Sequence, residues 1–166
     1  MRLSTFAVWA FNLPKVDLFN GAKLLTMLTH SNKVTIEASQ LYCYAIALLI
    51  KGYLVKDVLK MTKSEITLPT IKEWFEKEIE ADDKSKLTPL DSDKRFHVKV
   101  AFIWAFYYLK NEWSYKEALK DVLKGGGNFI TNASIVGGLI GAAQGQQAID
   151  KKDVVLSFDP AIHGGQ

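Results

Sequence analysis

The chain has little cysteine: Cys43 is the single one among 166 residues. A lone cysteine cannot form a disulfide within the chain, so the sequence fits the cytoplasm or another reducing intracellular compartment. Cys43 lies inside the apolar run 41–50, and no histidine or lysine is close to it in sequence. Because cysteines in apolar surroundings are usually unreactive, we expect Cys43 to fill the core rather than to act as a nucleophile.

Long apolar runs and basic stripes are also missing. Uninterrupted apolar stretches reach about ten residues, whereas a membrane-spanning helix needs about 20. The net charge is +3, and basic residues alternate with acidic ones, as in residues 72–78. This pattern is typical of a solvated surface, so we expect neither a membrane nor a nucleic acid as partner. Residues 1–11 resemble a short signal peptide, but 12–14 form a poor cleavage region, and we interpret the segment as structure.

The strict apolar–polar alternation of strands is absent, and helical periodicity runs through the chain. Apolar side chains on nearly all sides predict two helices buried within a bundle, over 33–51 and 96–109. Further helices are expected over 14–28, 54–61, from Thr70, from Ser114 to Lys124 and over 133–143. The expected class is therefore all-α, with one folded unit over 1–150. An irregular tail is expected over 151–166, with a short extended piece at 154–158.

Helix boundaries are marked by capping residues and glycines. Thr70 with Glu73, and Ser114 with Glu117, have the spacing of a capping box. Residues 29–32 interrupt the helical pattern and supply cap residues for the next helix. Three consecutive glycines, 125–127, end the helix before them and permit positive φ angles. Residues 81–93 are polar and contain a proline, which predicts a loop.

The most informative stretch is 125–145, which reads Gly-Gly-Gly-Asn-Phe-Ile-Thr-Asn-Ala and continues with small residues. It resembles the metal-binding motif of the ADP-ribosylglycohydrolase family, Gly-Gly-Asp-Thr-Asp-Thr-Asn-Ala followed by a small-residue helix. In that family the two Asp and the second Thr hold two Mg²⁺ ions. Here Asn128 and Ile130 occupy the Asp positions, and Thr131 keeps the Thr position.

Other segments resemble the same family in the same order. They are 1–5, 28–32, 97–102, 114–118 and 155–159. The resemblance covers nearly all of this chain but only the C-terminal half of the family's domain, and it implies an all-α orthogonal helical bundle. The family's Gly-Asp-x-x-Gly and Thr-Asp-Asp-Thr elements and its acidic catalytic residue belong to the other half. Asp82 and Asp83 lie in a polar loop, so we interpret them as solvated surface.

The two substitutions remove the metal chemistry that the resemblance would otherwise imply. Mg²⁺ prefers anionic oxygens in octahedral geometry. Asn128 offers a neutral carbonyl oxygen, and Ile130 offers no ligand atom. We therefore expect no metal cofactor and no catalytic residue in this chain.

The resemblance also implies a vestigial substrate site. Each of its residues has two possible roles. His30 lines the pocket or serves as a polar residue at a helix start. Gly126 and Gly127 form an anion nest or a plain turn between helices. Thr131 binds metal or caps a helix, and capping is favoured.

Two functions follow as hypotheses. The first is a catalytically inactive family member that acts as a binding or structural subunit of a larger assembly, with ADP-ribose as a ligand that is bound but not cut. The alternative is a magnesium-dependent hydrolase of ADP-ribose linkages, completed by an N-terminal half supplied elsewhere. In a half-domain the helices 33–51 and 96–109 would expose apolar surface, which predicts a protein partner that covers it.

Overall fold

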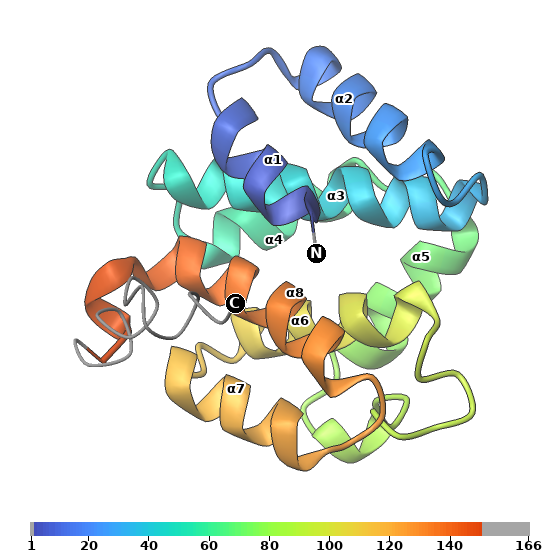
Figure 1. Cartoon of the computed structure of the whole chain (residues 1–166), viewed down its shortest axis with the longest axis vertical. Helices are drawn as coiled ribbons and strands as arrows, with labels where there is room; N and C mark the ends of the chain where they lie inside the picture. The colour runs from blue at the N-terminus through green and yellow to red at the C-terminus, as the bar shows by residue number, and fades with distance from the viewer. Residues whose placement is uncertain (1, 151–166) are drawn as a thin grey trace, which may run out of the picture.

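The computed structural model describes residues 2–150, and this part of the chain forms helices and no strand (Figure 1). The elements, in order, are α1 (Arg2–Ala10), α2 (Lys15–Met27), α3 (Lys33–Ile50), α4 (Val55–Ser64), α5 (Pro69–Trp74), the π-helical turn η1 (Phe75–Ile79), the 3-10 turn η2 (Lys84–Lys86), α6 (Val98–Lys110), α7 (Tyr115–Lys124), α8 (Phe129–Gln144) and the 3-10 turn η3 (Gln146–Ala148). The predicted all-α helical bundle is confirmed, and residues 2–10, within the segment that we interpreted as structure, form helix α1. The predicted tail, with its extended piece at 154–158, lies outside the described residues.

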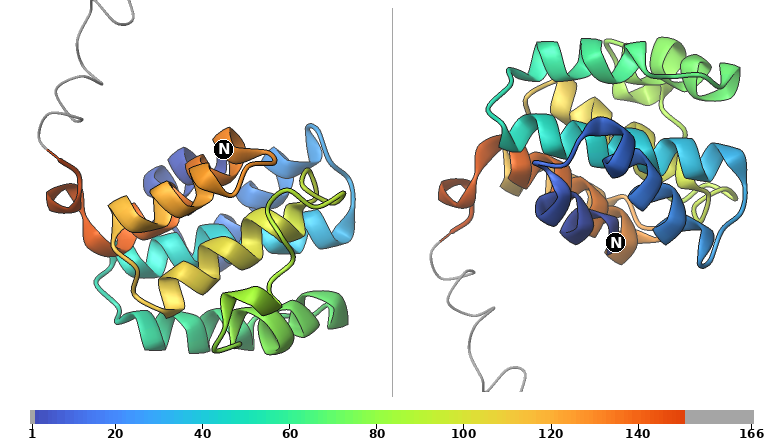
Figure 2. Two further views of the ribbon diagram at one scale, coloured as in Figure 1. Left: turned by 90° about the horizontal axis from the view of Figure 1, so that it is seen from below. Right: turned by 90° about the horizontal axis from the view of Figure 1, so that it is seen from above.

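The helices form three layers, with α3 and α6 in the middle (Figure 2). Helices α1, α2 and α8 cover one side of this middle layer, and α4, α5 and η1 cover the other. Helix α7 packs against α8. A helix covered on both sides must be apolar nearly all round, which explains the composition of α3 and α6.

The structure corrects the expectation that the helices over 33–51 and 96–109 expose apolar surface. Nearly all of 41–49 is buried, and so is every residue from Val100 to Leu109. The chain's own helices therefore cover the surface that we expected a partner to cover. Phe96, which precedes α6, is the exception and is 74% exposed.

Helix α3 is the one helix of the described residues that is long and apolar enough to cross a membrane. It has 18 residues with a mean hydropathy of 1.2, and 61% of it is buried inside the bundle. Core helices of globular proteins share this composition, and the position of α3 in the middle layer accounts for it.

Aromatic side chains fill the interior between α6 and η1. The rings of Phe102 and Phe106 are 4.6 Å apart between centroids, and Phe75 contacts both. On the other face of α6, the rings of Trp104 and Tyr108 are 5.5 Å apart between centroids and tilted by 43°. The aromatic side chains of α6 therefore belong to the core, as their continuous helical spacing predicts.

Most predicted boundaries are confirmed, and one capping box is wrong. Asn32 caps α3, since its Oδ1 accepts hydrogen bonds from the backbone of Val34 and Thr35. Ser114 caps α7. Its Oγ accepts a hydrogen bond from the backbone N–H of Glu117 and donates one to the Glu117 carboxylate. Helix α5, however, begins at Pro69 rather than after Thr70. Proline fits the first helical position because its missing N–H would be unpaired there in any case.

A buried carboxylate replaces the expected cap ahead of α5. Glu37, on α3, accepts hydrogen bonds from the backbone N–H groups of Thr67 and Leu68, each at 3.0 Å, and from the Thr67 hydroxyl. Two of the unpaired donors near the start of α5 are thus satisfied from another helix.

Candidate functional site

A cavity of about 610 Å³ opens where α8 begins, beside the end of α2 and the starts of α3 and α6. These helix ends lie together on the right-hand side of the bundle in Figure 1. Three of the predicted site residues line the cavity: His30, Asn128 and Thr131. Positions far apart in the sequence therefore meet at one place.

Three predicted site residues are not part of this lining. Ile130 points outward and is 65% exposed. Gly126 and Gly127 have positive φ angles, +71° and +63°, in the turn between α7 and α8. A Cβ on Gly127 would lie 2.0 Å from the carbonyl oxygen of Leu90. The glycine thus permits close packing of two backbones, which favours the turn interpretation over the anion nest.

The start of α8 places Asn128 and Thr131 in the cavity. Asn128 is the N-cap residue, and its side chain makes no capping hydrogen bond. Thr131 is the third residue of the helix, so the capping interpretation that was favoured for it is wrong. The first N–H groups of α8 have no partner within the helix, and the Asn128 side chain does not supply one.

His30 is held by a short chain of hydrogen bonds from α1. Arg2 Nη2 donates to the carbonyl oxygen of Leu25 at 2.8 Å and to Thr29 Oγ1 at 2.7 Å. His30 Nδ1 lies 2.8 Å from the same Thr29 hydroxyl. Asn32, and not His30, caps α3. The interpretation of His30 as a cavity residue is therefore the one that the geometry supports.

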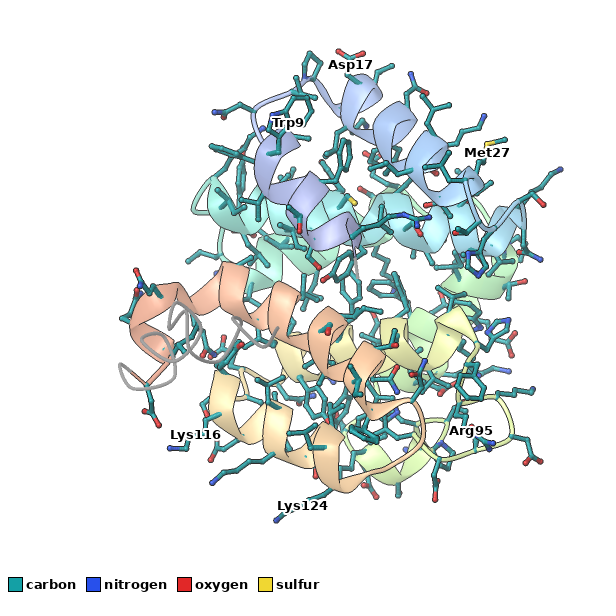
Figure 3. All side chains as sticks on the ribbon, in the orientation of Figure 1. Trp9, Asp17, Met27, Arg95, Lys116 and Lys124 are labelled. Carbon is teal, nitrogen blue, oxygen red and sulfur yellow. The ribbon has the colours of Figure 1, made fainter. Side chains whose placement is uncertain are left out.

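Two further lining residues precede α6, and sequence reasoning missed them as a site. His97 caps α6, with Nδ1 accepting a hydrogen bond from the backbone of Lys99 at 3.2 Å. In the neutral ring this leaves the proton on Nε2 as a donor. The guanidinium of Arg95 lies 5.2 Å from the ring centre of Phe96, and Figure 3 shows Arg95 in the loop ahead of α6. The only signal was an Arg-Phe-His run directly before a buried helix.

Asn132 is the most deeply buried polar residue of the cavity wall. It is 1% exposed, and its Nδ2 has no hydrogen-bond partner within residues 2–150. Its backbone N–H donates to Asn128, which places it one turn into α8. Leaving a buried donor unpaired costs about 1–3 kcal/mol, so this amide requires an explanation.

The electrostatics of the cavity favour anions over cations. Four lining residues carry positive charge or can gain it, namely Arg2, His30, Arg95 and His97, and no lining residue is Asp or Glu. No group of three His, Cys, Asp or Glu side chains within residues 2–150 is placed to hold a metal. The neutral oxygens of Asn128 and Thr131 do not fit Mg²⁺, which needs carboxylates at such a site.

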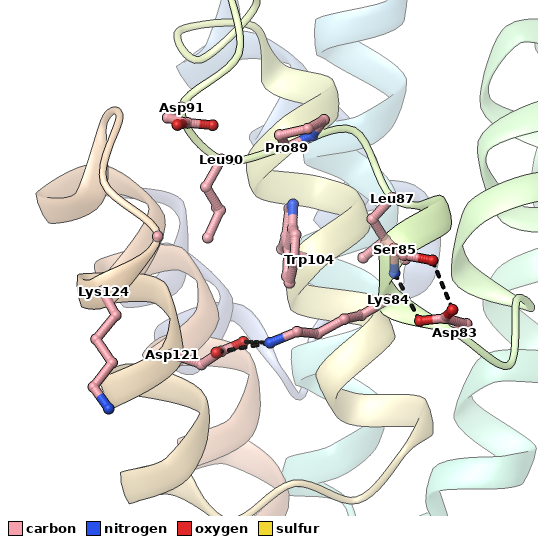
Figure 4. A pocket seen from close by; sticks show the side chains of 11 residues that line it. Asp83, Lys84, Ser85, Leu87, Pro89, Leu90, Asp91, Trp104, Asp121 and Lys124 are labelled. Atoms are coloured by element: carbon pink, nitrogen blue, oxygen red, sulfur yellow. Dashed lines mark hydrogen bonds and ion pairs between the residues drawn. The ribbon is translucent and has the colours of Figure 1, made fainter.

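A second hollow, of about 530 Å³, lies between the 83–91 loop and helices α6 and α7 (Figure 4). Several of its polar groups already have partners within the chain. Lys84 bonds Asp121 at 2.9 Å, and Tyr108 donates to the same carboxylate at 2.9 Å. Burial, followed by this hydrogen bond, raises the pKa of Tyr108. Trp104 Nε1 donates to the Thr88 carbonyl oxygen. We therefore assign this hollow to structure.

Comparison with models of protein families gives a match to the family described as ADP-ribosylglycohydrolase, over residues 1–154. Searches of curated proteins and of solved structures give no significant match. The matched range contains every helix of the described residues and the whole lining of the cavity.

Proposed function

Because the chain belongs to the ADP-ribosylglycohydrolase family, we propose that it is a catalytically inactive member that serves as a binding or structural subunit of a larger assembly. The observation that carries this proposal is the lining of the cavity at the start of α8. The family's metal-ligand positions meet the cavity as Asn128 and Thr131, in the company of two arginines and two histidines.

The donor set supports the proposed lack of activity. Removing one supporting group of a metal site already lowers affinity about 10–100-fold, so losing two carboxylates should cost at least about 10²–10⁴-fold. The positive charges of Arg2 and Arg95 at the same cavity oppose a divalent cation further. Ile130 adds to this, since its side chain is apolar and points away from the cavity.

The test restores the carboxylates and measures turnover. The wild-type chain and the Asn128→Asp/Ile130→Asp double variant are incubated with an ADP-ribosylated protein and Mg²⁺, and released ADP-ribose is quantified by mass spectrometry. We expect no release by either protein. Leu123→Asp, which places a carboxylate on an exposed site of α7, controls for charge alone. Turnover by the wild type would overturn the proposal, whereas turnover by the double variant alone would show that the two substitutions are the whole cause of the inactivity.

The alternative is a magnesium-dependent hydrolase of ADP-ribose linkages that is completed by elements supplied elsewhere. The observation in its favour is that His30, Asn128 and Thr131 meet in one cavity, as the family resemblance implies. Gel filtration of native material with mass spectrometry of the co-eluting proteins separates the two. A co-eluting chain with a Thr-Asp-Asp-Thr motif, and ADP-ribose release by the pair, would establish the alternative.

We also propose a protein partner, at a different surface from the one first expected. The outer side of α2 exposes Val16, Leu24, Met27 and Leu28, and the end of α1 exposes Trp9. Figure 3 places Trp9 and Met27 on the periphery of the bundle. Exposed apolar side chains gathered on neighbouring helices are typical of a protein contact.

A further inference from the structure

We propose that the groove between α4 and η1 binds an acidic segment of a partner protein, in which carboxylates flank a short apolar stretch. The groove has a volume of about 380 Å³, and both of its walls pack on α6. It lies on the opposite side of the middle layer from α1, α2 and α8 (Figure 2). It shares no lining residue with the cavity at the start of α8, so this inference goes beyond the proposed function and adds a second partner surface.

The floor of the groove is apolar. Phe75 and Ile79 reach it from η1, and Leu59 reaches it from α4. Lysine side chains line the groove beside them. A lysine lays its methylene stem on apolar surface and keeps its ammonium group in water. An occupant of the groove therefore meets apolar groups and ammonium groups together.

A π-helical turn shapes one wall. In η1 the backbone N–H of Glu80 donates to the carbonyl oxygen of Phe75, five residues earlier, at 2.9 Å. Turns of this kind are rare and occur frequently at functional sites. Lys110 Nζ donates to the carbonyl oxygens of Glu80 and Ala81 at 3.0 Å each. These bonds hold the end of the turn to α6, so the wall has a defined position.

Charge indicates the chemistry of the occupant. The lining contains four lysines and one glutamate, which gives it a net charge of +3. The glutamate, Glu80, pairs with Lys63 at 2.6 Å. Lys56 and Lys60 form no ion pair within residues 2–150. Two ammonium groups without counter-charges beside an apolar floor complement a ligand that carries both carboxylates and apolar side chains.

The spacing of the lysines favours a protein segment over other anions. Lys56, Lys60 and Lys63 lie on one face of α4 and span about 10 Å along the helix axis. A fatty acid brings one carboxylate, which cannot pair along that length, and a flat membrane surface does not enter a groove. Single-stranded nucleic acids stack on exposed aromatic rings, whereas Phe75 is buried. An acidic segment can place a carboxylate at each end of an apolar stretch.

The experiment uses random peptides displayed on phage, which are panned on the full chain at low ionic strength. We expect the enriched sequences to carry Asp or Glu on both sides of apolar residues. One enriched peptide is then labelled and titrated by fluorescence anisotropy. Its affinity should fall at least tenfold in about 1 M NaCl, because the Debye length is then about 3 Å.

Variants test whether the groove is the binding site. Lys56→Gln/Lys60→Gln should weaken peptide binding about threefold to tenfold, as expected of two partly exposed ion pairs. Lys120→Gln/Lys124→Gln removes two lysines at the same spacing from α7, outside the groove, and should leave the affinity within about twofold. Circular dichroism and thermal melting verify that each variant is folded.

Three results would overturn the inference: no enriched peptide, enriched peptides without acidic residues, or equal losses in the two lysine variants. Vesicles of phosphatidylcholine and phosphatidylserine provide a further probe, and we expect the chain not to pellet with them. Pelleting that is lost in Lys56→Gln/Lys60→Gln would assign the groove to a membrane surface instead. None of these measurements involves ADP-ribose release, so failure here is distinguishable from failure of the proposed function.

Discussion

Cys43 is enclosed in α3, with none of its surface exposed and its Sγ 3.7 Å from the carbonyl oxygen of Leu3. Burial disfavours the charged thiolate and raises the pKa of the thiol to about 12. A thiol that stays protonated is a poor nucleophile. This confirms the interpretation of Cys43 as core and removes it from the list of reactive groups.

The pKa of Cys43 predicts how the stability of the protein depends on pH. In the unfolded chain the thiol loses its proton near pH 8.5, but in the folded chain it keeps the proton to about pH 12. Between these values the native state binds more protons than the unfolded state, so the free energy of unfolding falls as pH rises. We expect urea midpoints to decline above about pH 9, and the decline to be smaller in Cys43→Ala.

A thiol reagent provides the direct check on Cys43. The native chain should not react with a disulfide reagent at pH 8 over an hour, and it should titrate one thiol in guanidinium chloride. Rapid reaction of the native chain would show that the thiol is accessible, contrary to its burial.

At the scale of elements, the turn between α7 and α8 fixes where α8 begins. Gly127 has a φ of +63° and lies against the backbone of Leu90. Gly52 also has a positive φ, +86°, but a Cβ there would meet nothing within 4 Å. Substitutions at the two glycines therefore distinguish the cost of a left-handed backbone from the cost of steric overlap.

Alanine at these two positions should give clearly different costs. Gly52→Ala pays only for the left-handed conformation, about 1–2 kcal/mol. Gly127→Ala must in addition displace the Leu90 backbone, and we expect a loss of about 3 kcal/mol or more in the free energy of unfolding. Urea denaturation measures both variants. Equal losses would mean that the packing of this turn against Leu90 does not contribute to stability.

Sequence periodicity was enough to predict most helices, because α3 and α6 carry apolar side chains on nearly every face and Asn32 and Ser114 are strong caps. The start of α5 was predicted too late, although Pro69 is a local signal for a first helical position, and its cap could not be predicted locally. It depends on Glu37, 30 residues earlier in the chain. Local capping rules cannot detect a cap that comes from another helix.

The candidate site was predictable only in part. The motif around Asn128 and Thr131, and His30 through the resemblance, were identified, and they meet at one cavity. Arg2, Arg95 and Asn132 were not identified, because their role depends on which helix ends converge. Charge in a cavity is a property of the tertiary structure, and single residues in a sequence do not reveal it.

At the scale of the whole molecule, the three layers determine which surfaces remain open. The middle layer of α3 and α6 is covered on both sides. Helix α2 lies in an outer layer and packs on α3 with one side only. Its other side exposes Val16, Leu24, Met27 and Leu28. Any apolar partner surface is therefore expected on the outer layer and not on the core helices.

The exposed side of α2 should bind a hydrophobic dye. Leu24 and Leu28 are 66% and 73% exposed and lie one turn apart, so both face solvent on the same side of the chain. We expect the Leu24→Glu/Leu28→Glu variant to bind less anilinonaphthalene sulfonate than wild type, with unchanged circular dichroism. Leu123→Glu alters a 52% exposed leucine on α7 and should leave dye fluorescence nearly unchanged.

If native assemblies captured by the wild type are also lost in the α2 variant but kept in the α7 variant, this surface contacts the partner. Equal dye binding by all three proteins would place the partner surface elsewhere.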